Sequence, residues 1–275
     1  MPPAARRPVV LPALPAPDTR LLARPPLEVV ICEVRVIAET PVTLGAAQGL
    51  QLKEAATAAG FEVDRLEPIE QQTLRVSAVP GAEATPLVDT RSGGWKLTSD
   101  DGYSIATVLP ESVNVQTTRY VSWEDTFRPL LTGALAAFAD VIRPAIRQRV
   151  GLRYVDRLVD PDASAAVAWR GRVVDALLGP IADPSLGERV INSQQQIDLA
   201  MGENRQALLR HGPFADGALH GAVSYLLDID VFDTTTTAFN IKNTLDVTDE
   251  LNKQALSLFQ VALSEPYLAT LRGDQ

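Results

Sequence analysis

Two carboxylates in the last quarter of the chain have the residue type and the spacing of a metal site. Asp228 and Asp230 stand two positions apart in a strand expected over residues 221–232, so their side chains point to the same side of that strand. Mg²⁺ binds carboxylate and water oxygens, so the pair suggests a metal-dependent, nuclease-like enzyme. The alternate positions of the strand are all apolar, which also explains the two acids as its solvent side. They are weak candidates, and we expect no metal. The apolar positions are Val223, Tyr225, Leu227, Ile229 and Val231.

Other sets of catalytic residue types are sparse. The two histidines, His211 and His220, lie in glycine-flanked stretches that are typical of a loop or a strand end. The sequence contains no Gly-x-Ser-x-Gly elbow, phosphate-binding loop or dinucleotide fingerprint. Cys32 is the single cysteine, which excludes an intramolecular disulfide and a cysteine-based zinc cluster. The sequence therefore favours a non-enzymatic protein, with no catalytic residues and no cofactor.

Two charged strands, far apart in the sequence, are the most specific feature of the chain. Residues 28–36 and 151–159 both read as strands, yet each carries charges where a buried strand has Val or Ile. We expect the two strands to lie side by side in one sheet, with their acids and arginines neutralising one another. The residues of this predicted network are Glu33, Arg35, Arg153, Tyr154, Asp156 and Arg157.

Three interpretations of the network stay open. It can be a structural ion network, an anion-binding floor built on Arg35, Arg153 and Arg157, or a face that binds a partner. If the charges are buried, removal of one partner costs about 3–5 kcal/mol, because the other charge is left uncompensated.

These two strands resemble the signatures of a sporadically distributed, uncharacterised bacterial protein family. The similar stretches are Pro-Leu-Glu-Val-Val-Ile-Cys-Glu-Val-Arg, which ends at Arg35, and Gly-Leu-Arg-Tyr-Val-Asp-Arg-Leu, which begins at Gly151. The resemblance covers residues 25 to about 272, and the family pattern has Asn where this chain has Asp156. It implies a folded unit of this size and no mechanism, while the sporadic distribution points to a defence or toxin–antitoxin type locus. The specific matches are Pro26, Glu28, Glu33, Arg35, Arg153, Tyr154 and Arg157.

The elements that position these residues are strands and amphipathic helices. The turn-forming run Ser99-Asp-Asp-Gly102 predicts a hairpin of strands 95–98 and 103–108. Ser122 is the expected N-cap of a long helix with an apolar stripe, which Pro144 ends or kinks. Further expectations are a helix over 43–60, strands over 61–66, 72–79, 114–120, 194–200 and 206–209, a loop over 80–94, a short helix near 169–178, and a final helix from Asp246 or Thr248.

Runs of strands followed by helices predict an α+β fold with largely antiparallel sheets. We expect two similar sub-domains, residues 27–160 and 161–275, each a curved antiparallel sheet with a long helix packed across it. Eight prolines lie between Met1 and Pro26, and they predict a disordered Pro/Ala-rich arm over residues 1–26.

Composition narrows the class of function. The chain has 275 residues and a net charge of −9, and an acidic surface repels phosphate backbones, which argues against nucleic acid as a partner. No apolar run is long enough for a bilayer, and prolines interrupt the N-terminus, so we expect a cytoplasmic protein without a membrane partner. The expected function is a protein-interaction or assembly module whose partner is a protein, including a second copy of the chain. The alternatives are a sensor of a small anionic ligand and the metal-dependent nuclease-like enzyme.

Overall fold

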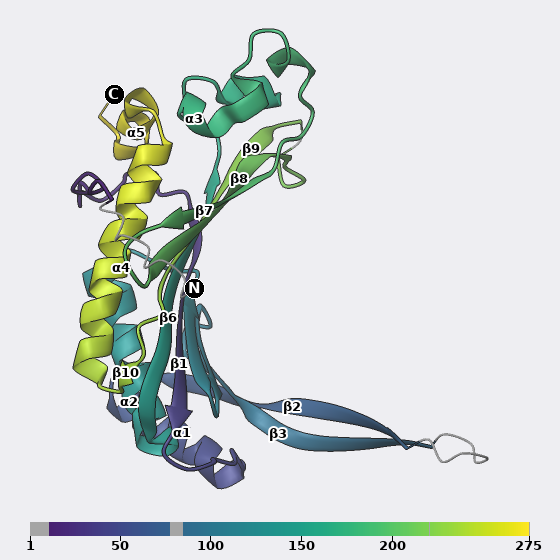
Figure 1. Ribbon diagram of the computed structural model, residues 1–275, viewed down its shortest axis with the longest axis vertical. Helices are drawn as coiled ribbons and strands as arrows, with labels where there is room; N and C mark the ends of the chain where they lie inside the picture. Colours follow the sequence, from purple (N-terminus) through teal and green to yellow (C-terminus); the bar gives the residue numbers. More distant parts are fainter. Residues whose placement is uncertain (1–10, 78–84, 220, 275) are drawn as a thin grey trace, which may run out of the picture. The chain divides into compact units, whose positions relative to one another are not determined.

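The computed structural model describes residues 11–77, 85–219 and 221–274. The chain is a mixed α/β protein with a large antiparallel sheet and helices (Figure 1), which confirms the predicted mixture and strand direction. It divides into two compact units, which are described separately. Unit 1 comprises Met1–Ile31, Arg149–Thr235 and Asp246–Gln275, and unit 2 comprises Cys32–Gln148 and Thr236–Leu245.

Unit 2 holds the meander that follows the first strand. Its strands are ordered β2-β3-β4-β5-β1, and β10 pairs with the start of β6 through Thr237 and Arg147. The elements are β1 (Leu27–Ala38, shared with unit 1), α1 (Ala46–Ala58), β2 (Val63–Ser77), β3 (Thr85–Ser99), β4 (Ser104–Leu109), β5 (Ser112–Thr117), a π-helical turn (Trp123–Phe127), α2 (Arg128–Ile142) and β10 (Thr237–Ala238).

Local sequence signals account for much of unit 2. The predicted hairpin is confirmed, because β3 and β4 pair from Trp95 to Thr98 and Gly102 adopts a positive φ of 76° in the turn. The Ser122 hydroxyl accepts a hydrogen bond from the Asp125 backbone N–H, as expected of an N-cap. The helix ends at Ile142, and the next residue, Arg143, has the left-handed φ of 51° just before Pro144.

The predictions for β2 and β3 were wrong in extent. β2 is one strand over Val63–Ser77, where two short strands were expected, and β3 begins at Thr85, inside the expected loop 80–94. The two strands pair from Val63 with Ser99 to Ser77 with Thr85, so cross-strand pairing overrides a composition rich in Gly, Pro and Thr. Residues 78–84 lie outside the described residues.

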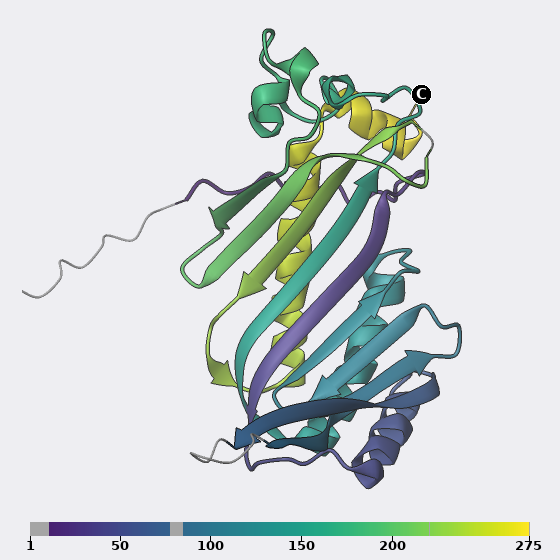
Figure 2. The ribbon, with the colours of Figure 1, turned by 90° about the vertical axis from the view of Figure 1, so that its right-hand side faces the viewer.

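Unit 1 carries the candidate site. Its strands are ordered β1-β6-β9-β8-β7, and the neighbours β6 and β9, β9 and β8, and β8 and β7 are antiparallel. Helix α4, which begins in unit 2, passes behind these strands in Figure 2. The elements are β6 (Pro144–Leu158), 3₁₀ turns (Ala166–Trp169, Gly179–Ile181 and Gly187–Arg189), α3 (Asp175–Leu178), β7 (Gln195–Ala200), β8 (Arg205–Ala215), β9 (Val223–Asp233), α4 (Ile241–Ala262) and α5 (Glu265–Arg272).

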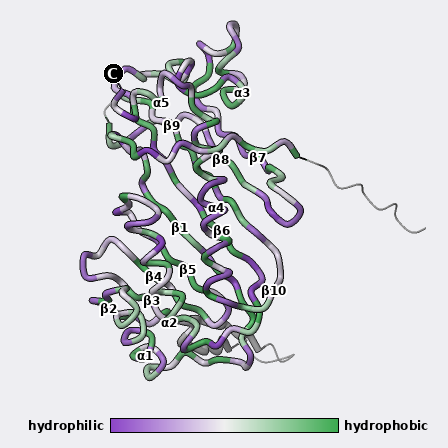
Figure 3. The backbone as a smooth tube through the Cα atoms, turned by 90° about the vertical axis from the view of Figure 1, so that its left-hand side faces the viewer, coloured by the Kyte–Doolittle hydropathy of each residue, from purple (hydrophilic) through white to green (hydrophobic). Residues whose placement is uncertain are grey.

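One face of the unit 1 sheet is core. On β9, Tyr225, Leu227, Ile229 and Val231 are fully buried, which is the apolar face that the sequence predicts. The alternation of hydrophobic and hydrophilic residues along α4 can be followed in Figure 3. The buried residues of α4 in this unit are Thr248, Leu251, Ala255, Ser257, Leu258, Phe259 and Ala262.

Several boundaries in unit 1 differ from the sequence-based expectations. The helix expected near 169–178 is split into the turn Ala166–Trp169 and the short α3, and α5 was not expected at all. Helix α4 begins at Ile241 rather than at Asp246, because the Asn240 side chain accepts from the Asn243 N–H and extends the first turn. The boundary that the sequence predicts between two sub-domains, at residue 160, falls inside unit 1. The sub-domains 27–160 and 161–275 stay a prediction.

No helix in the described part of the chain combines the length and the apolar character needed to cross a bilayer.

Candidate interaction site

A face of alternating arginines and aspartates covers the side of the unit 1 sheet opposite to its apolar core. Because side chains alternate along a strand, Arg153 on β6 and Asp228 and Asp230 on β9 share this side. Arg153 lies directly across from Asp230, and Asp228 lies between Val155 of β6 and Arg210 of β8. The charged face, as it is called below, consists of Arg149, Arg153, Arg157, Arg210, Asp228 and Asp230.

Asp228 is the centre of the charged face. Its side chain is only 3% exposed. It accepts two hydrogen bonds from Arg153, from Nε to Oδ1 at 2.6 Å and from Nη2 to Oδ2 at 2.7 Å. Arg210 Nη1 donates a third, at 3.3 Å. The hydrogen bond with Asp228 raises the pKa of the Arg153 guanidinium. A bidentate pair fixes the plane of the guanidinium, so Arg153 is held in one orientation.

Asp230 lies one step further along β9, against Arg149. The Arg149 Nη2 atom is 3.6 Å from Asp230 Oδ2, and its guanidinium lies over the Phe232 ring, 4.6 Å from the centroid. Burial raises the pKa of the Asp230 carboxyl above its usual range, and the charge of Arg149 opposes that shift. Arg149 thus contacts two side chains of β9, the Phe232 ring and the Asp230 carboxylate.

Arg157 is held by a loop residue. It donates from Nε to Asp216 Oδ2 at 2.7 Å, and its Nη1 atom is 3.6 Å from Glu28 of β1. The Ser224 hydroxyl donates to the same Asp216 oxygen at 2.5 Å. This hydroxyl, with help from Arg157, keeps the pKa of Asp216 below its usual range. The carboxylate is therefore ionised and paired at neutral pH.

The first charged strand has a different arrangement from the predicted one. Strands β1 and β6 are neighbours as expected, and the Arg157 N–H donates to the Pro26 carbonyl at 2.9 Å. However, Arg35 Nε donates to Glu33 on its own strand at 2.9 Å, in unit 2. The acids that hold Arg153 and Arg157 are Asp228, Asp216 and Glu28.

Tyr154 and Asp156 point to the core side of β6. The Tyr154 hydroxyl donates to the side-chain oxygen of Asn252 on α4 at 2.7 Å. Asp156 is 5% exposed and lies across from Leu227. Burial, and then the charge of Asp228, raise the pKa of the Asp156 carboxyl to about 8. Of the predicted network, Arg153 and Arg157 therefore lie on the charged face, while Tyr154 and Asp156 lie behind it.

His211 is a core residue and not a loop residue. It is fully buried in β8, and its Nδ1 atom is 2.8 Å from the Tyr225 hydroxyl. The Nε2 atom is buried and has no hydrogen-bond partner among the residues that the structure describes. Burial lowers the pKa of this imidazole, so it is neutral at pH 7. His220 lies outside the described residues.

The candidate metal ligands are engaged by arginines. Asp228 accepts from Arg153 and Arg210, and Asp230 faces Arg149. Within residues 11–77, 85–219 and 221–274, no group of three or more His, Cys, Asp and Glu side chains has the arrangement of a metal site. The two carboxylates thus have guanidinium partners where a metal site would need open oxygens.

Sequence reasoning missed two members of the charged face, Arg149 and Arg210, and the partner of Arg157, Asp216. Arg149 stands four positions before Arg153, on the same side of β6. The strand was expected to begin at residue 151, but it begins at Pro144, and the two-residue period from there includes Arg149. Arg210 lay one residue beyond the strand expected over 206–209. Asp216 follows β8 in a loop, and no local pattern connects it with Arg157, 59 residues earlier.

Unit 2 contains an open hollow of about 370 Å³. Arg119 at its wall is 3.7 Å from Asp101 and lies over the Tyr103 ring. The Asp101 carboxylate in turn accepts from the Ser99 hydroxyl and the Tyr103 N–H. These groups are matched to one another, and the Ser99 hydroxyl and the Tyr103 N–H both bond the Asp101 carboxylate as parts of the β3–β4 turn.

Comparison with known proteins gives no family. Models of protein families do not match the chain, and a search of curated proteins finds no significant match. The resemblance seen in the two charged strands stays a prediction, and the function is inferred from the geometry of the charged face.

Proposed function

We propose that the chain is a non-enzymatic protein-interaction module, and that the charged face of unit 1 binds a second copy of the chain. The observation that carries this proposal is the set of arginines held in fixed orientation by carboxylates behind them. Arg153 and Arg210 are each 40% exposed, while the Asp228 between them is almost fully buried. Arginines ordered before binding lose little conformational freedom on binding, and Arg is enriched at interface hot spots.

Apolar side chains share this face. Leu226 lies across from Arg157, Leu208 lies across from Asp230, and Phe232 lies under Arg149; all three are only partly buried. A mixture of arginine, aromatic and aliphatic surface is typical of the centre of a protein–protein interface. This composition supports a protein partner over a small polar ligand.

The balance of charge supports a second copy as the partner. Four arginines of the face and its neighbours are matched by four acids, so no net positive field remains to attract a phosphate or another anion. A face on which the two signs alternate is complementary to itself when a second copy is related by a two-fold axis. The residues are Arg149, Arg153, Arg157 and Arg210 with Glu28, Asp216, Asp228 and Asp230.

The two alternatives have weaker support. A sensor of an anionic ligand needs guanidinium groups that face a pocket, but Arg153 and Arg157 face carboxylates. A nuclease-like enzyme needs Asp228 and Asp230 to bind a metal, but both lie against arginines. A cytoplasmic location and a place in a defence or toxin–antitoxin type locus stay predictions, which localisation of the tagged protein and its gene neighbourhood can test.

We also infer that the chain contains two similar sub-domains that arose by duplication, each with a helix across its sheet. In unit 2, the first strand of the unit, β1, lies beside β5, which is the last strand of the meander β2-β3-β4-β5. In unit 1, β6 lies in the same way beside β9, which is the last strand of the meander β7-β8-β9. In both cases a long helix, α2 or α4, follows the meander in the chain. Two related sub-domains would give a self-associating protein two similar faces.

Sedimentation velocity over about 1–100 µM protein tests the proposal. We expect the unchanged chain to form dimers in this range and the double variant Arg153→Glu/Arg210→Glu to dimerise at least about tenfold more weakly. Lys253→Glu, an equal change of charge per residue on the exposed side of α4, is the control and should have no effect. Leu208→Glu is a second variant that leaves the ion pairs in place, and it should also weaken dimers. A monomer at every concentration, or equal dimers in all four proteins, would refute the proposal.

A further inference from the structure

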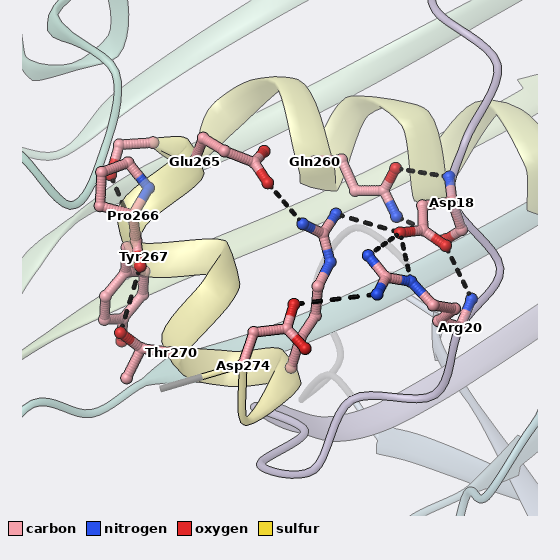
Figure 4. A network of polar contacts seen from close by, with 10 residues as sticks. Asp18, Arg20, Gln260, Glu265, Pro266, Tyr267, Thr270 and Asp274 are labelled. Carbon is pink, nitrogen blue, oxygen red and sulfur yellow. Dashed lines mark hydrogen bonds and ion pairs between the residues drawn. The ribbon is translucent and has the colours of Figure 1, made fainter.

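The N-terminal Pro-rich segment lies along α4 and α5 within unit 1 (Figure 4). We call residues 11–24 the strap. The strap has no regular secondary structure, and most of its residues are exposed. It was predicted to be a disordered arm, and residues 1–10 of that arm lie outside the described residues. The described part makes specific polar contacts, and these contacts have the chemistry of a peptide-binding site.

Gln260 of α4 recognises the backbone of the strap. Its side-chain amide donates from Nε2 to the Asp18 carbonyl at 2.7 Å and accepts from the Asp18 N–H at Oε1 at 2.9 Å. Both bonds are made to one residue, so the pair requires an extended backbone at that point. Because they involve main-chain atoms, the contacts hold an extended peptide whatever its side chain is at this position.

Two further hydrogen bonds hold the strap on either side of Asp18. The Ser257 hydroxyl donates to the Pro15 carbonyl at 2.8 Å, one turn before Gln260 on α4. The Arg24 N–H donates to the Leu271 carbonyl of α5 at 3.0 Å. The contacts thus follow the strap from Pro15 to Arg24 over two helices. Prolines in the strap restrict its backbone before it binds, which lowers the entropic cost of docking.

An arginine selects for an acidic side chain. Arg272 of α5 is only 10% exposed; it is held by Glu265 at 2.7 Å and lies 3.4 Å from the Asp18 carboxylate. Arg20 of the strap also pairs with Asp18, at 2.8 Å, and its hydrogen bond is the main reason that the pKa of Asp18 is lowered. The site therefore combines backbone recognition with a preference for aspartate.

We propose that the surface formed by Ser257, Gln260 and Arg272 is a binding site for an extended, proline-rich peptide that carries an aspartate. The strap fills it within its own chain, and the strap of a second copy fills it in trans. Exchange of the strap needs no new contact, because every group that holds Asp18 in cis is present in the second copy. Pro25 and Pro26 follow the strap and join it to β1, at the place where an exchanged segment would leave its own unit.

The tethered strap competes strongly with an added peptide. A segment joined by a short linker has an effective concentration of about 1 mM, so the unchanged chain should bind added peptide only weakly. Asp18→Arg in the chain places a cation near Arg272, and we expect it to release the strap and open the site. The two hydrogen bonds of Gln260 account for at least about a tenfold change in affinity for the peptide.

Fluorescence anisotropy with a labelled synthetic peptide of residues 11–24 tests this site. The full chain with Asp18→Arg should bind the peptide at least about tenfold more tightly than the unchanged chain, and Asp18→Arg/Gln260→Ala should lose that gain. Hydrogen exchange at residues 15–24 establishes strap release in the variants. If Asp18→Arg leaves the strap protected, replacement of residues 15–18 by Gly-Ser-Gly-Ser serves as the released chain.

A released chain that fails to bind the peptide, or that binds it equally well after Gln260→Ala, would overturn the proposal. A peptide in which Asp18 is replaced by Ala should bind more weakly, and equal binding would remove the role assigned to Arg272. The outcome is independent of the charged face, because none of these variants alters the residues on β6, β8 or β9.

Discussion

Substitution of the buried Asp156 by Asn should stabilise the protein at neutral pH and should not stabilise it at pH 4. Asp156 is almost fully buried on the core side of β6, and its pKa is raised to about 8 by burial and by Asp228. In the unfolded chain the carboxyl has its ordinary pKa, close to 4. Between about pH 4 and pH 8 the folded protein therefore holds a proton that the unfolded chain has released. The cost to stability grows as the pH rises through this window and is absent below it.

The magnitude follows from the size of the pKa difference. Each pKa unit corresponds to about 1.4 kcal/mol, so the proton costs at most about 5 kcal/mol at pH 7.5. The buried amide of Asn without a partner offsets about 1–3 kcal/mol of this gain. We therefore expect Asp156→Asn to raise the free energy of unfolding by about 2–4 kcal/mol at pH 7.5, or the melting temperature by roughly 4–16 °C.

Urea or thermal unfolding at pH 4.5 and at pH 7.5 measures this difference. The matched control is Asp216→Asn, because Asp216 has a lowered pKa and an arginine partner. That variant should lose stability at both pH values, because the lowered pKa of Asp216 keeps its contribution in place until the pH falls below the ordinary pKa of Asp. Equal stability of Asp156→Asn and the unchanged chain at pH 7.5, or a loss, would show that Asp156 is ionised and compensated, and would refute the reasoning.

Three other substitutions test the packing and the ion pairs. The unchanged chain should lose stability below about pH 6.5, because the His211 imidazole takes up a proton when the chain unfolds but stays neutral when it is buried. In His211→Gln the free energy of unfolding should depend less on pH in this range, and urea unfolding from pH 5 to pH 7.5 measures this difference. Gly49→Ala should cost about 1–3 kcal/mol and alter tryptophan fluorescence, because the added Cβ would lie 2.4 Å from the Trp95 ring, whereas Gly217→Ala meets open space and should be neutral. Asp228→Ala should destabilise the protein by about 1–3 kcal/mol in thermal unfolding, since it leaves two half-exposed arginines without their shared carboxylate.

Short-range signals explain what the sequence predicted well. The Asp-Gly turn before β4 and the Ser122 cap before α2 act on residues within four positions, and both are confirmed. The alternation in β9 identified its core face correctly for the same reason. By contrast, β3 reads as a loop when taken alone, because its Gly, Pro and Thr residues are held in a strand by pairing with β2.

The candidate site was predictable only in part. The two-residue period of a strand is enough to put Arg153 and Arg157 on one side of β6 and Asp156 on the other, as the structure has them. Their partners were not predictable, because Asp216 and Asp228 come from segments 59 and 75 residues away. Asp156 lies near the charge of Asp228 because β6 pairs with β9, and neither strand sequence alone predicts that register.

Footprinting of arginines with phenylglyoxal at low and at high protein concentration tests the central claim most directly. If the charged face binds a second copy, modification of Arg153 and Arg210 should fall as the protein is concentrated. Modification of Arg119, which is 67% exposed in unit 2, should stay the same. Unchanged modification of Arg153 and Arg210 in a sample that sedimentation shows to be dimeric would contradict the account. So would protection of Arg119 in their place.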